Sequence, residues 1–245
     1  MEIVFLGNYT QDLLVKKLEN DWKEDNIHVA GFNQYQQEII NPDSFLYNRQ
    51  PDVVFISLDF YSLVEDILYL KVAPQLIFKK VEQRIEETIQ LFKGASESLP
   101  NSQIFIDNFY LFRPTLMATL ESNAYSSVSE FVNLANYHLI REIKTLSNVK
   151  IVDVLSMVIN KGVSRLFDER MYYIAKNHWS FSGLQDIVDL YSRYLNAFLG
   201  KRKKCLVLDL DNTLWGGIIG DDGIDNIGLS NDGPNKAFYD FQREI

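Results

Sequence analysis

Short runs of consecutive apolar residues recur along the first 200 residues, and amphipathic segments separate them. A continuous apolar run bounded by turns predicts a strand that is buried on both faces. Strands that alternate with helices favour a parallel sheet with helices packed on both sides. The segments expected to form strands are residues 3–6, 51–57, 103–107 and 149–154, together with residues 27–32, where apolar residues alternate weakly.

Apolar residues three or four positions apart predict the helices between these strands. One helix covers about residues 11–23, and another follows Pro74 and ends at Gly94. Two further helices begin at capping boxes, Ser127 with Glu130 and Ser182 with Gln185. We therefore expect a flavodoxin-like α/β domain over residues 1–200, with a domain boundary at residues 200–204 where Gly200 ends the last helix.

Composition excludes several classes of function. The formal net charge is −9, without a compensating basic face, which argues against a nucleic-acid-binding protein. No signal peptide is recognisable and no apolar run approaches the length of a membrane span, so we expect a cytoplasmic protein that uses no membrane. The single cysteine, Cys205, permits no intrachain disulfide and is expected to pack inside a strand.

Two carboxylates follow a further apolar run, Cys205–Leu208, which is expected to form a buried strand. Asp209 and Asp211 are one residue apart and fall at the carboxyl end of that strand, where ligands gather in parallel sheets. A carboxylate can attack a phosphate ester or acyl phosphate, and a second one can transfer protons to and from the reacting groups. A divalent cation, normally Mg²⁺, offsets the repulsion between carboxylate and phosphate.

The segment Asp209-Leu210-Asp211-Asn212-Thr213 resembles the first motif of the haloacid dehalogenase (HAD) superfamily of phosphotransferases. The resemblance implies that Asp209 is the nucleophile and that Asp211 is the general acid and base. It also implies that Asp209 and the backbone carbonyl of Asp211 hold Mg²⁺, and that Thr213 fixes the loop. Residues 201–245 are thus expected to begin a HAD domain with a Rossmann-like fold.

The continuation, Leu214-Trp215-Gly216-Gly217-Ile218-Ile219-Gly220, resembles the FkbH-like branch of this superfamily. That branch joins an N-terminal domain related to SGNH hydrolases to a HAD domain. It implies a phosphorylated small molecule as substrate and the transfer of a glyceryl unit to an acyl-carrier protein. Gly216 and Gly217 would let the backbone turn tightly beside the site.

The expected SGNH-like half departs from the pattern of its hydrolase relatives. Their nucleophilic serine follows the first strand in a Gly-Asp-Ser turn, and this chain has Gly7-Asn8-Tyr9-Thr10 there. Thr10 is an alternative nucleophile, His178 a late histidine, and Asn108 an oxyanion-hole candidate. The aspartate expected three residues before the histidine is replaced by Ala175. We therefore expect a scaffold or docking domain in preference to an esterase.

Two alternatives to a phosphatase or phosphotransferase stay open from the sequence. One is a non-catalytic, partner-binding module with a vestigial HAD site, and the other is an esterase or acyltransferase in the N-terminal half. Phosphate-binding Ser or Thr, a Lys and later acidic metal ligands complete the chemistry of HAD enzymes. We do not find them in residues 205–245, so the chain is expected to be part of a longer enzyme.

Overall fold

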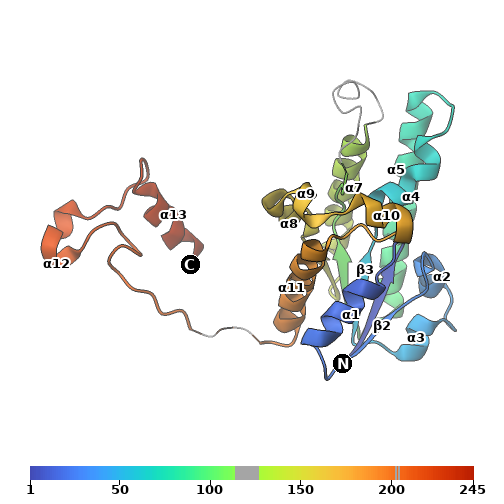
Figure 1. Cartoon of the computed structure of the whole chain (residues 1–245), viewed down its shortest axis with the longest axis horizontal. Helices are drawn as coiled ribbons and strands as arrows, with labels where there is room; N and C mark the ends of the chain where they lie inside the picture. Colours follow the sequence, from blue (N-terminus) through green and yellow to red (C-terminus); the bar gives the residue numbers. More distant parts are fainter. Residues whose placement is uncertain (114–126, 202, 204) are drawn as a thin grey trace. The chain divides into compact units, whose positions relative to one another are not determined.

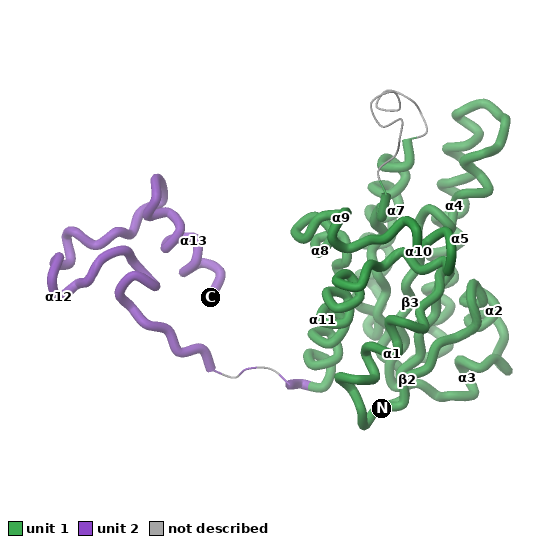
Figure 2. Tube along the Cα trace, in the orientation of Figure 1, with its two compact units in different colours: residues 1–199 green, residues 200–245 purple. Residues whose placement is uncertain are grey.

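The structure is a computed structural model that describes residues 1–113, 127–201, 203 and 205–245. The chain divides into two compact units, Met1–Leu199 and Gly200–Ile245, which Figure 2 colours separately. Elements of the first unit are β1 (Glu2–Gly7), α1 (Asp12–Asp21), β2 (Asn26–Val29), α2 (Tyr35–Ile40), α3 (Phe45–Arg49), β3 (Val53–Ser57), α4 (Phe60–Leu68), α5 (Pro74–Ser98), β4 (Gln103–Asp107), α7 (Val128–Ile143), β5 (Val149–Val152), α8 (Val154–Lys161), α9 (Val163–Leu166), α10 (Glu169–Ala175) and α11 (Phe181–Phe198).

The five strands of the first unit form one parallel sheet in the order β2-β1-β3-β4-β5 (Figure 1). All five expected strands are present, although β2, β3 and β5 are shorter than the segments that predicted them. The inner strands are buried on both faces, as in β3, whose five residues are all buried. The prediction of a parallel α/β sheet is therefore confirmed for this unit.

Helices cover both faces of the sheet and produce two apolar cores (Figure 1). Helices α2, α4, α5 and α7 pack on one face around a core that includes Phe60, Phe92 and Phe131. Helices α1 and α8 to α11 pack on the other face around a core that includes Phe5, Phe55 and Tyr191. Because all connections are parallel crossovers, the loops that follow the strands meet at one edge, which we call the carboxyl edge of the sheet.

Helix termini match the sequence patterns unevenly. The Ser127 side chain accepts the Glu130 N–H, so the cap of α7 is confirmed. The predicted end of α5 at Gly94 is wrong, because Gly94 keeps a negative φ and Ala95 continues the buried face as far as Ser98. The predicted cap of α11 at Ser182 is also wrong by two residues, since Ser180 accepts the Gly183 N–H at 2.9 Å.

The second unit contains α12 (Ile219–Asp222), the 3₁₀ helix η1 (Ile224–Asn226) and α13 (Lys236–Glu244). The predicted strand Cys205–Leu208 does not form, and Cys205 is exposed instead of packed inside a sheet. Val207 is 88% exposed, because no described residue of this unit offers a strand to pair with it. Residues 202 and 204 of the expected domain boundary lie outside the described residues, and the HAD domain stays a prediction.

Among the described residues, no helix combines the length and the apolar character that crossing a bilayer requires.

Candidate functional site

The two aspartates singled out by the sequence lie in the second unit and differ in their surroundings. Asp209 is exposed, and its carboxylate accepts the Leu210 N–H at 2.8 Å. Asp211 is half-buried, and its Oδ1 accepts the indole N–H of Trp215 at 3.0 Å and the Ile219 N–H at 3.3 Å. Asp211 is thus oriented by two donors, while Asp209 is accessible to a ligand.

The chain turns sharply directly after these carboxylates. Leu214 N–H donates to the Leu210 carbonyl at 2.9 Å, and Thr213 contributes its backbone N–H to the same carbonyl at 3.3 Å. Asn212 adopts a left-handed conformation with φ of 55°, which asparagine tolerates better than most residues. Its side chain accepts the Gly217 N–H at 2.9 Å and closes the turn.

Gly216 and Gly217 lie where the backbone approaches neighbouring side chains closely. Gly216 exchanges two backbone hydrogen bonds with Gly228, and a Cβ at Gly216 would come within 3.0 Å of the Phe238 ring. Gly217 has φ of 97°, and a Cβ there would lie 2.9 Å from an oxygen of Asp222. Gly217 therefore requires glycine because of its positive φ, as the sequence predicted for a tight turn, and a side chain at Gly216 would have to displace the Phe238 ring slightly.

The chemistry of these carboxylates fits a hard cation, but the described residues supply only part of a ligand set. Mg²⁺ prefers oxygen ligands and is commonly held by one or two carboxylates together with water and substrate phosphate. Both donors to Asp211 reach the same oxygen, Oδ1. No group of three or more His, Cys, Asp or Glu side chains within the described residues could hold a metal ion. Asp209 and Asp211 thus account for two ligands at most.

Asn8, at the carboxyl edge of the first unit, joins two loops. Its side-chain amide donates to the Asp59 carbonyl at 2.9 Å, and its Oδ1 accepts the Asp59 N–H at 2.7 Å. Both groups of the Asn8 amide are therefore used to hold the loop after β1 against the loop after β3. Asn8 is 5% exposed, so its role in the structure is to position these loops.

Thr10, the alternative nucleophile, is tied to the segment before α11 through its backbone. Its N–H donates to the Lys176 carbonyl at 3.0 Å. A nucleophilic hydroxyl needs a base at hydrogen-bond distance. The imidazole Nε2 of His178 is instead 2.9 Å from the hydroxyl of Tyr110.

His178 is completely buried in aromatic side chains. The ring centroids of Tyr9, Phe112 and Trp179 lie 4.4, 5.0 and 5.1 Å from that of His178. Burial lowers the pKa of His178 to about 3, so the imidazole is neutral at physiological pH. Its Nδ1 has no hydrogen-bond partner, and Ala175 supplies no carboxylate. This geometry does not form a catalytic triad.

Asn108, the oxyanion-hole candidate, is also engaged within the fold. Its side-chain N–H₂ donates to Asp153 at 2.8 Å, and its Oδ1 accepts the Leu155 N–H at 2.9 Å. These bonds connect the end of β4 to the first turn of α8. The amide therefore anchors a helix instead of pointing toward a ligand.

The structure contains a buried polar cluster that the sequence patterns missed. The hydroxyls of Ser57 and Tyr191 both donate to Asp107 Oδ2, at 2.5 and 2.6 Å, and the hydroxyl of Tyr9 lies 2.8 Å from that of Ser57. Burial raises the pKa of Asp107 to about 7. Ser57 and Asp107 are the last residues of β3 and β4. Each is a polar residue at the end of a buried apolar run, and this pattern is the sequence signal that could have identified them.

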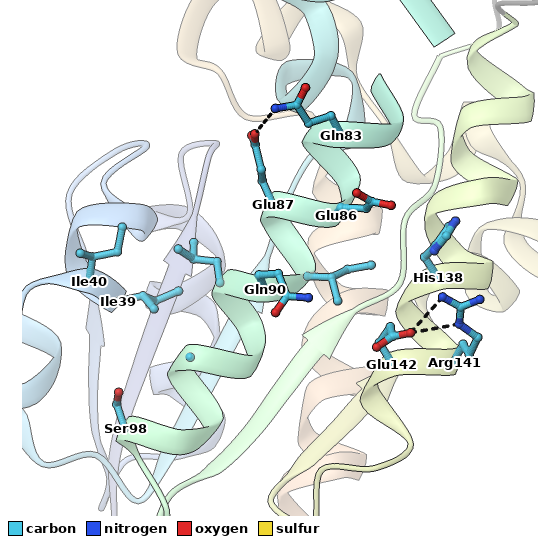
Figure 3. Close-up of a pocket in the computed structure, with 13 residues that line it drawn as sticks. Ile39, Ile40, Gln83, Glu86, Glu87, Gln90, Ser98, His138, Arg141 and Glu142 are labelled. Atoms are coloured by element: carbon cyan, nitrogen blue, oxygen red, sulfur yellow. Dashed lines mark hydrogen bonds and ion pairs between the residues drawn. The ribbon is translucent and has the colours of Figure 1, made fainter. Parts of the chain in front are cut away.

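An open groove of about 830 Å³ lies along α5, between α2 and α7 (Figure 3). Ile39 and Ile40 line it on the side of α2, and His138, Arg141 and Glu142 line it on the side of α7. Glu142 is already paired with Arg141 at 3.0 Å and with Lys93 at 2.5 Å. The groove therefore presents aliphatic side chains beside one neutralised glutamate, Glu142, and two glutamates of α5, Glu86 and Glu87, that form no ion pair with a described residue.

The profile of a family described as FkbH, N-terminal domain, matches residues 2–189. The chain is also similar to the solved N-terminal part of a Bacteroides fragilis protein that contains a phosphatase domain, in complex with Mg, with 26% identity and a TM-score of 0.84. All of this chain is covered, and it spans 64% of the length of that structure. Comparison with curated proteins gives no match.

An acetyl xylan esterase has a TM-score of 0.55 and 10% identity to this chain, covering 80% of this chain and 100% of the esterase. At that identity the likeness concerns the fold alone, which is that of the SGNH hydrolases. The expected resemblance to the FkbH family is confirmed by the match over residues 2–189. The chain therefore belongs to the family of FkbH N-terminal domains, and its five-stranded unit has an SGNH-like fold.

Proposed function

We propose that the full-length protein is a Mg²⁺-dependent phosphatase or phosphotransferase of the HAD type, with Asp209 as nucleophile. The observation that carries the proposal is the pair Asp209 and Asp211, one exposed and one oriented by Trp215, within the Leu-Trp-Gly-Gly segment typical of this branch. Support comes from the similarity over the whole chain to a protein that contains a phosphatase domain and was solved with Mg.

The chemistry assigns one step to each carboxylate. An oxygen of Asp209 attacks the phosphorus atom, and the bond to the leaving oxygen breaks as that oxygen takes a proton from Asp211. Water then attacks the aspartyl-phosphate, gives a proton to Asp211, and releases phosphate from Asp209. Asp209 and the backbone carbonyl of Asp211 would hold Mg²⁺, which would supply positive charge that offsets the repulsion between carboxylate and phosphate.

Asp211 is suited to the role of proton donor by its contacts. Two N–H donors hold one of its oxygens, so its carboxyl group has a fixed orientation relative to the turn. Asp209 accepts one backbone N–H and is otherwise exposed, as a nucleophile requires. Gly217 supplies the positive φ that this turn needs, and Gly216 allows close approach to the Phe238 ring.

The substrate in this proposal is a small phosphorylated metabolite, whose phosphoryl group passes first to Asp209 and then to water. The N-terminal unit then acts as a scaffold or docking domain instead of an esterase. Two features of this unit support a scaffold role. His178 is neutral, buried and bonded to Tyr110, and the turn after the first strand, which ends at Thr10, contains no serine.

The proposal is tested by the release of phosphate from acetyl phosphate by the full-length protein in the presence of Mg²⁺. We expect Asp209→Asn to lower the rate by at least about a thousandfold, because the amide cannot replace the nucleophile. Asp225→Asn is the matched control, since Asp225 is an exposed aspartate of the same unit that follows the Asp211 turn. Its rate should equal that of the unmodified protein.

Equal rates for Asp209→Asn and Asp225→Asn would contradict the proposal. Absence of Mg²⁺-dependent phosphate release from the unmodified full-length protein, with this substrate and with a sugar phosphate, would favour the non-catalytic alternative, a partner-binding module with a vestigial site.

A further inference from the structure

The sheet of the first unit has a topological switch point between β1 and β3. In the order β2-β1-β3-β4-β5, the chain leaves β1 toward β2 and then returns to the other side of β1 to form β3. Helix α1 follows β1 onto one face, and α4 follows β3 onto the other. The loops after β1 and β3 therefore diverge at the carboxyl edge, where parallel α/β folds bind ligands.

Arg113 lies near this switch point and is surrounded by aromatic rings. Its guanidinium carbon is 3.9 Å from the ring centroid of Tyr61, the second residue of α4, and 5.6 Å from that of Tyr172. One of its N–H groups donates to the hydroxyl of Tyr173 at 2.6 Å. An arginine stacked on an aromatic face keeps its remaining in-plane N–H groups free to bind an acceptor.

Lys176 provides a second positive charge beside the same tyrosine. Its ammonium nitrogen lies 4.7 Å from the ring centroid of Tyr172. Lys176 has φ of 52° and ends α10, and its carbonyl accepts the Thr10 N–H from the loop after β1. The switch point therefore has two cations beside the ring of Tyr172, and one of them, Lys176, is bonded through its backbone to the loop after β1.

Acidic side chains near these cations do not neutralise them by direct pairing. The oxygens of Asp59 accept the N–H groups of Tyr61 and Ser62 and the Ser62 hydroxyl, so they cap α4. Burial raises the pKa of Asp59, and Arg113 acts on it only as a nearby charge. Glu65 also lies nearby, where its charge helps to raise the pKa of Tyr61 and Tyr172.

No carboxylate of the described residues is within ion-pair distance of Arg113 or Lys176. Two cations beside one tyrosine ring at a switch point, neither of them in an ion pair with a described residue, are a place where an external anion can bind.

We propose that Arg113 and Lys176 form a binding site for a small anion with at least two terminal oxygens, either a phosphate group or a carboxylate. The planar guanidinium can donate two parallel hydrogen bonds to such a group, and Lys176 adds a mobile ammonium. The site belongs to the first unit and uses neither Asp209 nor Asp211. It gives the SGNH-like unit a ligand-binding function without a serine nucleophile.

The test is calorimetric titration of the 245-residue chain with inorganic phosphate in the presence of EDTA, which removes divalent cations that could bring phosphate to Asp209. We expect saturable binding that Arg113→Met weakens at least about tenfold, because a charge-assisted pair of hydrogen bonds is lost. Arg49→Met is the matched control, since Arg49 is an exposed arginine that also lies over an aromatic ring, at 5.0 Å from the Phe45 centroid. It should bind phosphate as the unmodified chain does.

A second variant keeps the test decisive if Arg113→Met does not fold. Lys176→Gly retains the positive φ and removes the ammonium, so it should fold normally and bind phosphate several-fold more weakly. Acetate as a competitor distinguishes the two sources of the anion: displacement of phosphate indicates a carboxylate ligand, and no displacement indicates a phosphoryl ligand. Phosphate binding that is absent, or unchanged in both Arg113→Met and Lys176→Gly, would overturn the proposal.

Discussion

Asp107 and His178 are two buried titratable residues whose pKa values are shifted in ways that have opposite effects on stability. Burial raises the pKa of Asp107 from 3.8 to about 7 and lowers that of His178 from 6.5 to about 3. Between about pH 4 and 7 the folded state therefore binds more protons at Asp107 than the unfolded state does, and stability falls as pH rises. At His178 the folded state binds fewer protons between about pH 3 and 6.5, so stability rises with pH there.

Asp107→Asn separates these opposing contributions. The variant keeps an acceptor for the hydroxyls of Ser57 and Tyr191 and removes the buried acid. We expect the free energy of unfolding of the variant, minus that of the wild type, to increase from about pH 4 to about pH 7 and then to level off. A shift of about three pKa units corresponds to roughly 4 kcal/mol at most. Urea unfolding at a series of pH values measures it.

The exposed Asp43→Asn serves as the control for this pH series. Its difference from the wild type should show no such rise. A difference for Asp107→Asn that stays constant across the same pH range would contradict a buried acid that titrates near neutrality.

At the scale of single residues, the sequence predicts which residues carry the chemistry, but it does not predict the contacts that they make. The pair Asp209 and Asp211 could be selected from the motif alone, and the glycines after it from the need for a tight turn. The hydrogen bond from the indole of Trp215 to Asp211 could not be predicted from the sequence, because a bond across a turn depends on the folded geometry. His178 was found by its place before the last helix, but its burial among aromatic rings required the structure.

Gly94 and Gly183 are helix glycines with opposite surroundings. A Cβ at Gly94, inside α5, would meet nothing within 4 Å. A Cβ at Gly183, in the first turn of α11, would lie 2.0 Å from the carbonyl oxygen of Leu166. Glycine is therefore needed for the close approach of α11 to α9, and it is unnecessary in the middle of α5.

We expect Gly94→Ala to stabilise the chain by up to about 1 kcal/mol, the difference in helix propensity between the two residues. Gly183→Ala should destabilise it by at least about 2 kcal/mol, because backbone atoms must move to relieve the collision. Thermal unfolding of both variants measures this pair. A Gly183→Ala variant that unfolds at the same temperature as the wild type, or at a higher one, would show that the packing of α11 against Leu166 is not as tight as described.

At the scale of elements, periodic helices and continuous apolar strands could be predicted, while their ends could not. Gly94 matches the preference for glycine at a helix stop, yet the apolar face of α5 continues through Ala95. Ser180 and Ser182 both satisfy the preference for serine at a cap, and only the hydrogen bond to Gly183 distinguishes them. The run Cys205–Leu208 has a strand composition but no described partner strand, and pairing is what forms a strand.

At the scale of the whole molecule, the alternation of strands and helices predicted a parallel α/β sheet, and the sheet is present. The strand order β2-β1-β3-β4-β5 could not be predicted from the alternation of strands and helices, because strand order depends on which helices pack on which face. The second unit buries no residue in α12, η1 or α13, so its described residues form no core of their own. The chemistry proposed for the second unit follows from its motif residues. Its described residues form no sheet, so the expected HAD fold stays a prediction.

The central claim, that Asp209 is the phosphorylated nucleophile of the full-length protein, is tested most directly by isolating the covalent intermediate. Asp211→Asn should slow hydrolysis of the aspartyl-phosphate, so the phosphorylated form accumulates when acetyl phosphate and Mg²⁺ are added. After an acid quench, mass spectrometry should find one phosphoryl group on the peptide that contains Asp209, and Asp209→Asn should abolish it. A phosphoryl group on any other residue, or turnover without any phosphorylated peptide, would contradict the claim.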